Sequence, residues 1–304
     1  IKELELKLNT TIAPCIERVD LLNQLVVYYL NVDLDKTKLL IEEALTIAEE
    51  LHYQEGIGLS ILQLGVYYYL LNDIENALKN YLNADLILAR SKNWKNRIKP
   101  KANIAMVYIH TQQYLEALRI YKEIEEEISD IPLDIVHAQM YINIDAAYCY
   151  LNDPKNGIIY SQKALEISKK LNNRYGIAIS ESNFGGHLML LNQPEEALQH
   201  IIISHEICEA NDYITIQVVN LYSFTYCYSR LNQFEKALDA AGKAILMAKE
   251  MQDTSREMLI LKQVMDIYEK QQDFENAFQT SKKYIDVKEK MLNNDKIKSF
   301  NTLQ

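Results

Sequence analysis

The stretch that decides the fold is residues 58–92, GLSILQLGVYYYLLNDIENALKNYLNADLILARSK. Wound as a helix, its first half carries apolar residues on two faces: Leu59, Leu62, Val66 and Tyr69 on one, and Leu64, Tyr68 and Leu71 on the other. This pattern predicts a helix buried on two sides. Asn72 then tolerates the left-handed conformation that ends a helix, and Asp73 can cap the next one. A second helix is expected through Ala77 and Leu88, so the stretch predicts a helix pair.

The same pair recurs along almost the whole chain. In steps of 40 residues the sequence shows Tyr28, Tyr68, Tyr108, Tyr148, Leu188, Tyr228 and Tyr268. Nine positions after each of these stands a small residue: Thr37, Ala77, Ala117, Gly157, Ala197, Ala237 and Ala277. The interruption between helices repeats as well, with Pro154 and Pro194 in a first helical turn. At that position the N–H that proline lacks would make no hydrogen bond within the helix. A fixed period is the signature of a repeat architecture, so we expect one elongated stack of about seven helix pairs.

These residues resemble the tetratricopeptide (TPR) repeat family. Its pattern of Leu-Gly, Tyr, Ala, aromatic and Ala is matched by Leu64-Gly65, Tyr68, Ala77, Tyr81 and Ala84. The resemblance covers roughly residues 16–290, with a period of 40 rather than about 34 residues, as in the extended repeats of bacterial signalling receptors and kinesin light chains. It implies an all-α, right-handed superhelical solenoid of about seven TPR-like helix pairs plus a C-terminal exit or capping helix.

The repeat limits predict three parts: an N-terminal helical lead-in at 1–15, seven repeats at 16–283 and an exit or capping helix at 284–304. The chain begins with Ile1 rather than Met, so we expect it to have been cut from something longer. Some positions depart from the family pattern. The small residue beside the first-helix leucine is replaced at Asp145 and Met265, and the second-helix aromatic is lost at Ser161, Ile201, Ala241 and Ser281. Local geometry at these positions is left open.

Composition and charge narrow the class of protein. A formal net charge of −10 argues against general attraction to nucleic acid or to an anionic membrane, because phosphate binding relies on Lys and Arg. No apolar run approaches the roughly 20 residues needed to cross a bilayer, and no signal-peptide pattern is present. The cysteines have no paired spacing, which favours a reducing, cytoplasmic location over a disulfide framework; they are Cys15, Cys149, Cys208 and Cys227.

The first candidate site is a column of amide side chains. In TPR stacks the first helix of each pair lines the concave surface, and one groove-facing position lies fourteen residues before the small residue. In this chain it holds Asn23, Gln63, Asn103, Asn143, Asn183, Ser223 and Gln263, here called the amide column. A carboxamide both donates and accepts hydrogen bonds, so such a ladder can bind the main chain of an extended peptide. The alternative is that each amide only bonds within the stack.

Neighbouring columns add aromatic, amide and cationic groups to the predicted groove: Lys99, His110, Gln139, Tyr150, His187, Tyr226 and Arg230. This mixture suits peptide recognition, and ordinary packing or a solvated edge is the alternative for each His and Tyr. Lys99 and Asn103 match two members of the carboxylate clamp of TPR co-chaperones. Val66 stands where a second clamp asparagine belongs, which argues against a chaperone-tail adaptor.

A run of six cations surrounds Trp94 and Pro100, with no acid among them: Arg90, Lys92, Lys95, Arg97, Lys99 and Lys101. Such a run indicates either a partner surface or a solvated helix junction.

Catalytic chemistry is not predicted. Gly185-Gly186 sits inside a helix rather than in a phosphate-binding loop after a strand. His200 and His205 are five residues apart, which places them on different helical faces, unlike a helical zinc site. We therefore expect no catalytic residue, no metal and no cofactor.

Three functions remain open. Residues 284–291 resemble the exit helix of bacterial proteins in which a TPR sensor precedes an output domain such as a diguanylate cyclase or a histidine kinase. The leading hypothesis is the sensory or interaction region of a larger bacterial signal-transduction protein, with a peptide or protein partner in the concave groove, no nucleic acid and a possible homodimer through the C-terminal helix. The alternatives are a free-standing peptide receptor resembling quorum-sensing TPR regulators, or an assembly scaffold.

Overall fold

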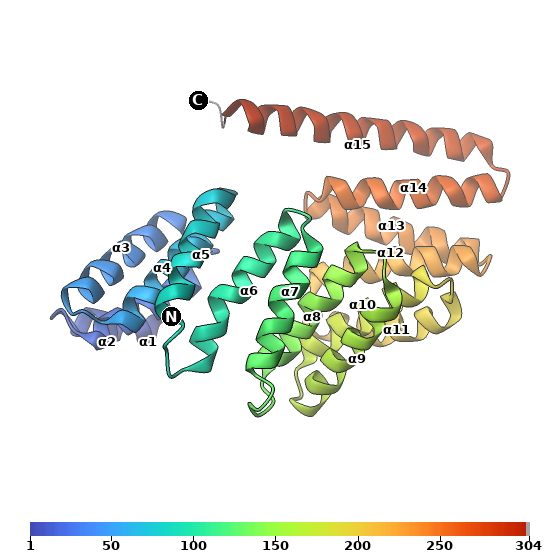
Figure 1. Ribbon diagram of the computed structural model, residues 1–304. Coiled ribbons are helices and arrows are strands. Elements are labelled where there is room, and N and C mark those ends of the chain that lie inside the picture. Colours follow the sequence, from blue (N-terminus) through green and yellow to red (C-terminus); the bar gives the residue numbers. More distant parts are fainter. Residues whose placement is uncertain (302–304) are drawn as a thin grey trace. The chain divides into compact units, whose positions relative to one another are not determined.

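The computed structural model describes the backbone of residues 1–301 and the side chains of residues 1–292. Within that part every regular element is an α-helix, as expected (Figure 1). The chain divides into two compact units, Ile1–Pro132 and Leu133–Gln304. Each unit is a stack of helix pairs, and each is described by itself below.

The first unit begins with a lead-in helix that packs on the first helix pair. Three pairs follow it, formed by α2 with α3, α4 with α5 and α6 with α7. The bounds are α1 (Lys2–Thr10), α2 (Ile16–Tyr29), α3 (Leu34–Glu50), α4 (Gln54–Leu70), α5 (Ile74–Leu88), α6 (Trp94–His110) and α7 (Tyr114–Glu127).

The second unit contains four pairs, so that the described part of the chain has the seven pairs expected from the 40-residue period. The bounds are α8 (Ile135–Tyr150), α9 (Pro154–Lys170), α10 (Arg174–Leu190), α11 (Pro194–Asn211), α12 (Ile214–Arg230), α13 (Phe234–Glu250), α14 (Thr254–Lys270) and α15 (Phe274–Asn301). The last helix is 28 residues long and lies beside α14 (Figure 1). The boundary predicted at residue 284 falls inside α15 and stays a prediction, and residues 302–304 lie outside the described part.

The helix ends follow from the residues that the period places there. Non-glycine residues with positive φ stand at the junctions: His52, Asn72, Gln112, Asn152, Asn172, Asn192, Asp212, Asn232, Gln252 and Gln272. Six of these lie on the 40-residue period between the two helices of a pair. The next helix then starts on a capping side chain, since Asp73 accepts a hydrogen bond from the Asn76 backbone N–H at 3.1 Å. The predicted pairing of a left-handed stop with an N-cap is confirmed.

Small residues bring the two helices of a pair together. Ala77, Ala117, Ala197 and Ala237 are completely buried. A Cβ added at Gly65 would lie 2.6 Å from the Tyr81 ring, so the aromatic of α5 packs directly on the backbone of α4. Tight packing of this kind leaves no room for added volume. The predicted role of the small residues is therefore confirmed.

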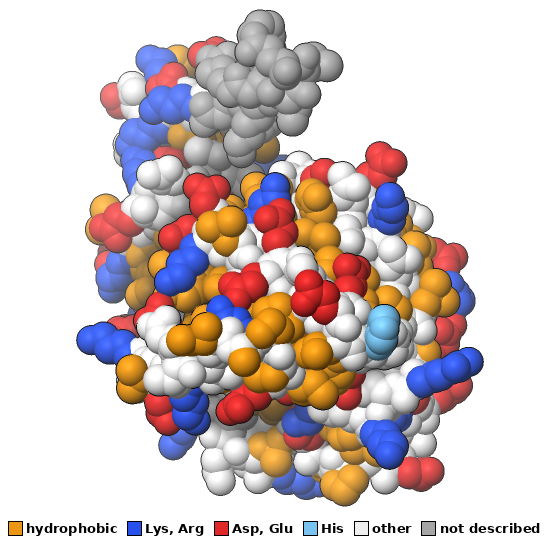
Figure 2. Space-filling model, turned by 90° about the vertical axis from the view of Figure 1, so that its left-hand side faces the viewer, with side chains coloured by type: hydrophobic (Ala, Val, Ile, Leu, Met, Phe, Trp, Pro, Cys, Tyr) orange, Lys and Arg blue, Asp and Glu red, His pale blue; other side chains and the backbone are white. Residues whose placement is uncertain are grey.

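The surface carries charges of both signs. On the part of the face drawn in colour in Figure 2, acidic, basic and hydrophobic side chains are interspersed, with no broad area of one charge. Within the described residues, no helix is both long and apolar enough to pass through a lipid bilayer.

Candidate functional site

The amide column of the first unit is divided between packing and open positions. Asn23 is buried, and its Nδ2 donates to Ser60 Oγ at 3.1 Å and to the Val19 carbonyl at 3.2 Å. Asn23 thus links α2 to α4 within the stack. Gln63 and Asn103 are half-buried instead, so that they keep surface available to a ligand.

Two other predicted residues of the first unit lie at the surface of α6. Lys99 has an exposed side chain, yet partial desolvation lowers the pKa of its amine, with repulsion from Lys95 adding to the effect. His110 is exposed, and its Nδ1 lies 3.2 Å from the hydroxyl of Tyr69 on α4. The two rings meet edge to face, with centroids 5.4 Å apart.

The run of cations around Trp94 is partly neutralised from within the same unit. Arg97 Nε lies 2.9 Å from Glu127 Oε1, and Lys101 Nζ lies 2.7 Å from Glu127 Oε2. Burial alone would raise the pKa of Glu127, but these two hydrogen-bonded cations hold it below its ordinary value. Two of the six cations therefore serve the contact between α6 and α7.

In the second unit the amide column again serves more than one purpose. Asn143 is half-buried and accepts a hydrogen bond from Gln139 Nε2 at 3.1 Å. Ser223 is buried and donates to the Val219 carbonyl in its own helix. Asn183 donates from Nδ2 to Asp145 Oδ2 at 2.6 Å and so bonds into the interior. Gln263 is half-buried.

His187, expected in the groove, lies in the interior. Its exposed fraction is 1%, and its Nε2 hydrogen-bonds with Asp145, which is also 1% exposed. Ser161 Oγ donates to the same carboxylate at 3.0 Å. These residues, with Asn183 and Gly157, are here called the Asp145 cluster. Tyr150, by contrast, is 62% exposed near the end of α8.

The Asp145 cluster is assembled from the departures noted in the repeat pattern. Asp145 takes the position that Gly65 holds in the second repeat, and Ser161 takes the position of Tyr81. Since no aromatic ring covers the backbone there, the carboxylate fits and Ser161 bonds to it. The two replacements compensate one another, and this cannot be seen when each is read in the sequence as a separate departure from the repeat pattern.

A second buried carboxylate lies on α10. Glu181 is 1% exposed, and it receives Lys169 Nζ at 3.1 Å and His200 Nδ1 at 2.6 Å. The His200 ring stacks on Phe184, with centroids 4.3 Å apart. Burial raises the pKa of Glu181, yet the bonds from His200 and Lys169 outweigh it and hold that pKa below the ordinary value. This ion pair joins α9, α10 and α11.

Three predicted residues meet in a hollow of about 520 Å³ between the first helices α12 and α14. It is lined by Tyr226, Ser229, Arg230, Gln263, Asp266, Glu269 and Lys270, and is here called the α12–α14 hollow. The Arg230 guanidinium lies 5.9 Å from the centre of the Tyr226 ring. The hydroxyl of Tyr226 donates to the Met189 carbonyl on α10 at 3.4 Å. An aromatic face, an amide and charges of both signs thus share one concavity.

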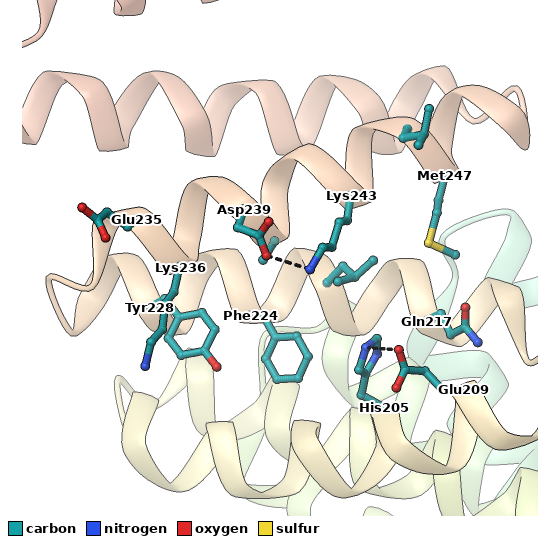
Figure 3. A pocket seen from close by; sticks show the side chains of 13 residues that line it. His205, Glu209, Gln217, Phe224, Tyr228, Glu235, Lys236, Asp239, Lys243 and Met247 are labelled. Carbon is teal, nitrogen blue, oxygen red and sulfur yellow. Dashed lines mark ion pairs between the residues drawn. The ribbon is translucent and has the colours of Figure 1, made fainter.

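A larger hollow of about 770 Å³ was not expected from the sequence (Figure 3). It lies between the second helices α11 and α13, with Leu221, Phe224 and Tyr228 of α12 among its lining residues. Two ion pairs border it, His205 with Glu209 at 3.4 Å and Asp239 with Lys243 at 2.7 Å (Figure 3). No motif in the sequence marks this hollow, since its lining side chains follow the ordinary pattern of amphipathic helices.

His205 is a half-buried titratable group in the lining of this larger hollow. Its ring lies edge to face with Phe224, with centroids 5.2 Å apart. Burial lowers the pKa of His205, because the charged imidazole loses water, although Glu209 acts in the opposite direction. Among the described residues, no three His, Cys, Asp or Glu side chains are grouped so as to hold a metal ion.

No protein-family profile matches the chain, but curated relatives and solved structures do. Two curated proteins of Bacillus subtilis (strain 168) are similar to part of it: response regulator aspartate phosphatase I is 20% identical over 159 residues, or 52% of this chain, and regulatory protein RapC is 24% identical over 130 residues, or 42%. These segments span only 39% and 34% of the two relatives.

Solved structures match over most of the chain. The apo form of RapI has a TM-score of 0.73 at 13% identity, covering 90% of this chain and 99% of that one. A Rap protein complexed with Competence and Sporulation Factor has a TM-score of 0.66 at 16% identity, covering 89% and 76%. A STAND signal-transduction ATPase with a TPR sensor, from Pyrococcus horikoshii, has a TM-score of 0.68 at 15% identity, covering 88% and 41%. The chain therefore has the fold of a tetratricopeptide-type helical-repeat protein.

Proposed function

We propose that this chain is a regulatory module of bacterial signal transduction that binds a peptide or an extended protein segment on its first helices. The observation that carries the proposal is the α12–α14 hollow, where Tyr226, Arg230 and Gln263 of the expected groove lie together. A peptide offers main-chain donors and acceptors to the amide and an apolar side chain to the aromatic ring. The solved structure of a Rap protein complexed with Competence and Sporulation Factor supports this, because that protein shares the fold of this chain.

Not every predicted position enters the proposed contact surface. We assign it to the second unit alone, where it comprises Gln139, Asn143, Tyr150 and the α12–α14 hollow. Gln63, Lys99 and Asn103 belong to the first unit, and a ligand contact there is a separate proposal. Asn183 and His187 act from behind this surface, since both bond to the buried Asp145.

The mechanism we propose is mechanical. A ligand that contacts several first helices favours one packing of each helix pair on the next, and it shifts the equilibrium by its difference in affinity between the two packings. The Asp145 cluster joins α8, α9 and α10 through hydrogen bonds to one carboxylate. Asn183 is half-buried and bonds to Asp145. In this proposal a ligand bound on the first helices acts on the Asp145 cluster through Asn183.

The larger context also belongs to the proposal. Similarity to the STAND protein, of which this chain covers 41%, supports a sensory region within a longer signalling protein. A free-standing receptor is the alternative proposal, and the fold of the solved RapI chain is compatible with it. We make three further proposals for this chain: that it is cytoplasmic, that it acts as an assembly scaffold as an alternative to peptide binding, and that it forms a homodimer through α15.

We propose no catalytic activity for the chain itself. One relative is named a response regulator aspartate phosphatase, but the similarity spans 39% of it and supports no assignment of a catalytic group here. Incubation with a phosphorylated response regulator checks this: unchanged hydrolysis of the aspartyl phosphate is expected, and accelerated hydrolysis would overturn it.

Peptide binding is tested by passing short random-sequence peptides over the immobilised protein and identifying the retained ones by mass spectrometry. A synthetic copy of a retained peptide should bind with about tenfold lower affinity after Tyr226→Ala, since stacking and packing on the ring are worth over 1 kcal/mol. Leu246→Ala is the matched control, because Leu246 lines the other hollow. Equal losses in the two variants would count against the assigned site.

A further inference from the structure

Arg230 and Lys270 occupy the same position in successive repeats, forty residues apart, at the last residue of α12 and of α14. Earlier repeats hold Leu30, Leu70, His110, Tyr150 and Leu190 at this position, so only the last two carry a permanent cation. Both residues line the α12–α14 hollow and also a neighbouring hollow of about 400 Å³. The two cations therefore lie at the place that both hollows share.

Each of the two cations is held by a neutral oxygen. Arg230 Nη2 donates to Asn192 Oδ1, and Lys270 Nζ donates to Ser229 Oγ at 3.1 Å. Among the side chains that the structure describes, no carboxylate lies within ion-pair distance of either one. The two bonds fix the position of the charges without neutralising them.

Spare donors remain on both groups. A guanidinium carries five N–H donors and an ammonium three, and the described contacts use one of each. A guanidinium fork matches the two oxygens of a carboxylate, and a lysine adds a second charge-assisted bond. The chemistry of the pair thus suits a carboxylate.

Acidic groups also line the two hollows that the pair shares. Asp266 and Glu269 line the α12–α14 hollow, and Glu195 lines its neighbour. In the α12–α14 hollow they balance the two cations, so selection of a carboxylate there depends on the hydrogen bonds that Arg230 and Lys270 offer rather than on net charge.

We propose that Arg230 and Lys270 together bind one carboxylate of a peptide, whose adjoining residues lie against Tyr226 and Gln263. The inference rests on the proposed peptide-binding function and adds the chemical group that anchors the ligand. That group is either the C-terminus of the peptide or an Asp or Glu side chain.

Four random peptide pools test this proposal on the immobilised protein. One has free C-termini, one has amidated C-termini, one has free C-termini but lacks Asp and Glu, and one is amidated and lacks both acids. The last pool carries no carboxylate and should be retained about tenfold less than the first, the loss expected for one charge-assisted contact. If amidation alone causes the loss, the anchor is the C-terminus; if removal of Asp and Glu alone causes it, the anchor is a side chain.

Substitutions test whether the difference in retention depends on Arg230 and Lys270. The double variant Arg230→Gln with Lys270→Gln should bind all four pools equally. Lys262→Gln removes an exposed cation of α14 outside the described hollows and should leave the difference intact. A matching melting temperature shows that the double variant is folded.

The other outcomes separate the two proposals. Equal retention of all pools by the parent overturns the carboxylate anchor and leaves peptide binding standing. If Lys262→Gln also abolishes the difference in retention between the peptide pools, the anchor is overturned too, because the difference then depends on the overall charge of the protein. Retention of no pool above that on immobilised albumin overturns the proposed function itself, and the anchor with it.

Discussion

The ring of His187 occupies the space that a side chain at Gly157 would need. A Cβ built on Gly157 would lie 2.2 Å from Cε1 of that ring. The small-residue position of the fourth repeat holds glycine rather than alanine because the histidine of the fifth repeat reaches over it to Asp145. A local exception in the repeat is thereby explained by a residue thirty positions away.

Gly157→Ala should destabilise the protein, although alanine is the better helix former. Overpacking costs on the order of 1–3 kcal/mol, against at most about 1 kcal/mol gained in helix propensity. Urea unfolding measures the change. Adding His187→Ala should make Gly157→Ala stabilising, because the methyl group then has room; a cost that persists in the double variant would show that His187 is not the obstacle.

His187→Val should cost about 3–5 kcal/mol, since it leaves the Asp145 carboxylate buried without its main partner. Asp145→Ala combined with His187→Val should cost less than His187→Val alone, because no buried carboxylate is then left without the histidine. Equilibrium denaturation of the two variants decides this. Equal losses in both would mean that the cluster contributes through packing rather than through its charge.

The amide column should separate into two classes. Asn23→Ala should destabilise by about 1–3 kcal/mol, because Ser60 loses its buried partner. Asn143→Ala should change stability by no more than about 0.5 kcal/mol, as expected for a half-buried side chain, while weakening peptide binding. Thermal melts and binding assays on the same two proteins provide the comparison, and unchanged binding would remove Asn143 from the site.

His205 should make stability depend on pH below about 6.5, its ordinary pKa. Burial lowers its pKa in the folded state, so the unfolded chain takes up the proton first. The stabilisation from this group is therefore complete above the unfolded pKa and is lost as the pH falls through the folded pKa. His205→Phe should show a smaller drop in melting temperature between neutral and mildly acidic pH. Parallel curves for variant and parent would contradict this.

The fold itself could be predicted from patterns of residues that lie close together in the chain. The period of Tyr68, Tyr108 and Tyr148, the small residues and the Asn-Asp junctions all act over a few helical turns, where periodicity, capping and left-handed backbone are local properties. The seven helix pairs and their junctions accordingly match the expectation.

The roles of the polar side chains could not be predicted in this way. Asn23 and Asn143 hold the same place in the repeat, yet one bonds to Ser60 across the stack and the other lies half-buried beside Gln139. Ser60 lies 37 residues from Asn23, nearly a full repeat away, and a periodic pattern carries no information about such a distant partner.

Repetition along the chain was thus sufficient to specify an all-helical TPR stack, because each helix pair contacts mainly its neighbours and needs only a local code. Only the folded structure decided that His187 turns inward to Asp145, and that Arg230 and Lys270 meet without a described acidic partner. The physical reason is that hydrogen bonds and charge pairs act across a few ångströms in space, between residues that packing, rather than sequence order, brings together.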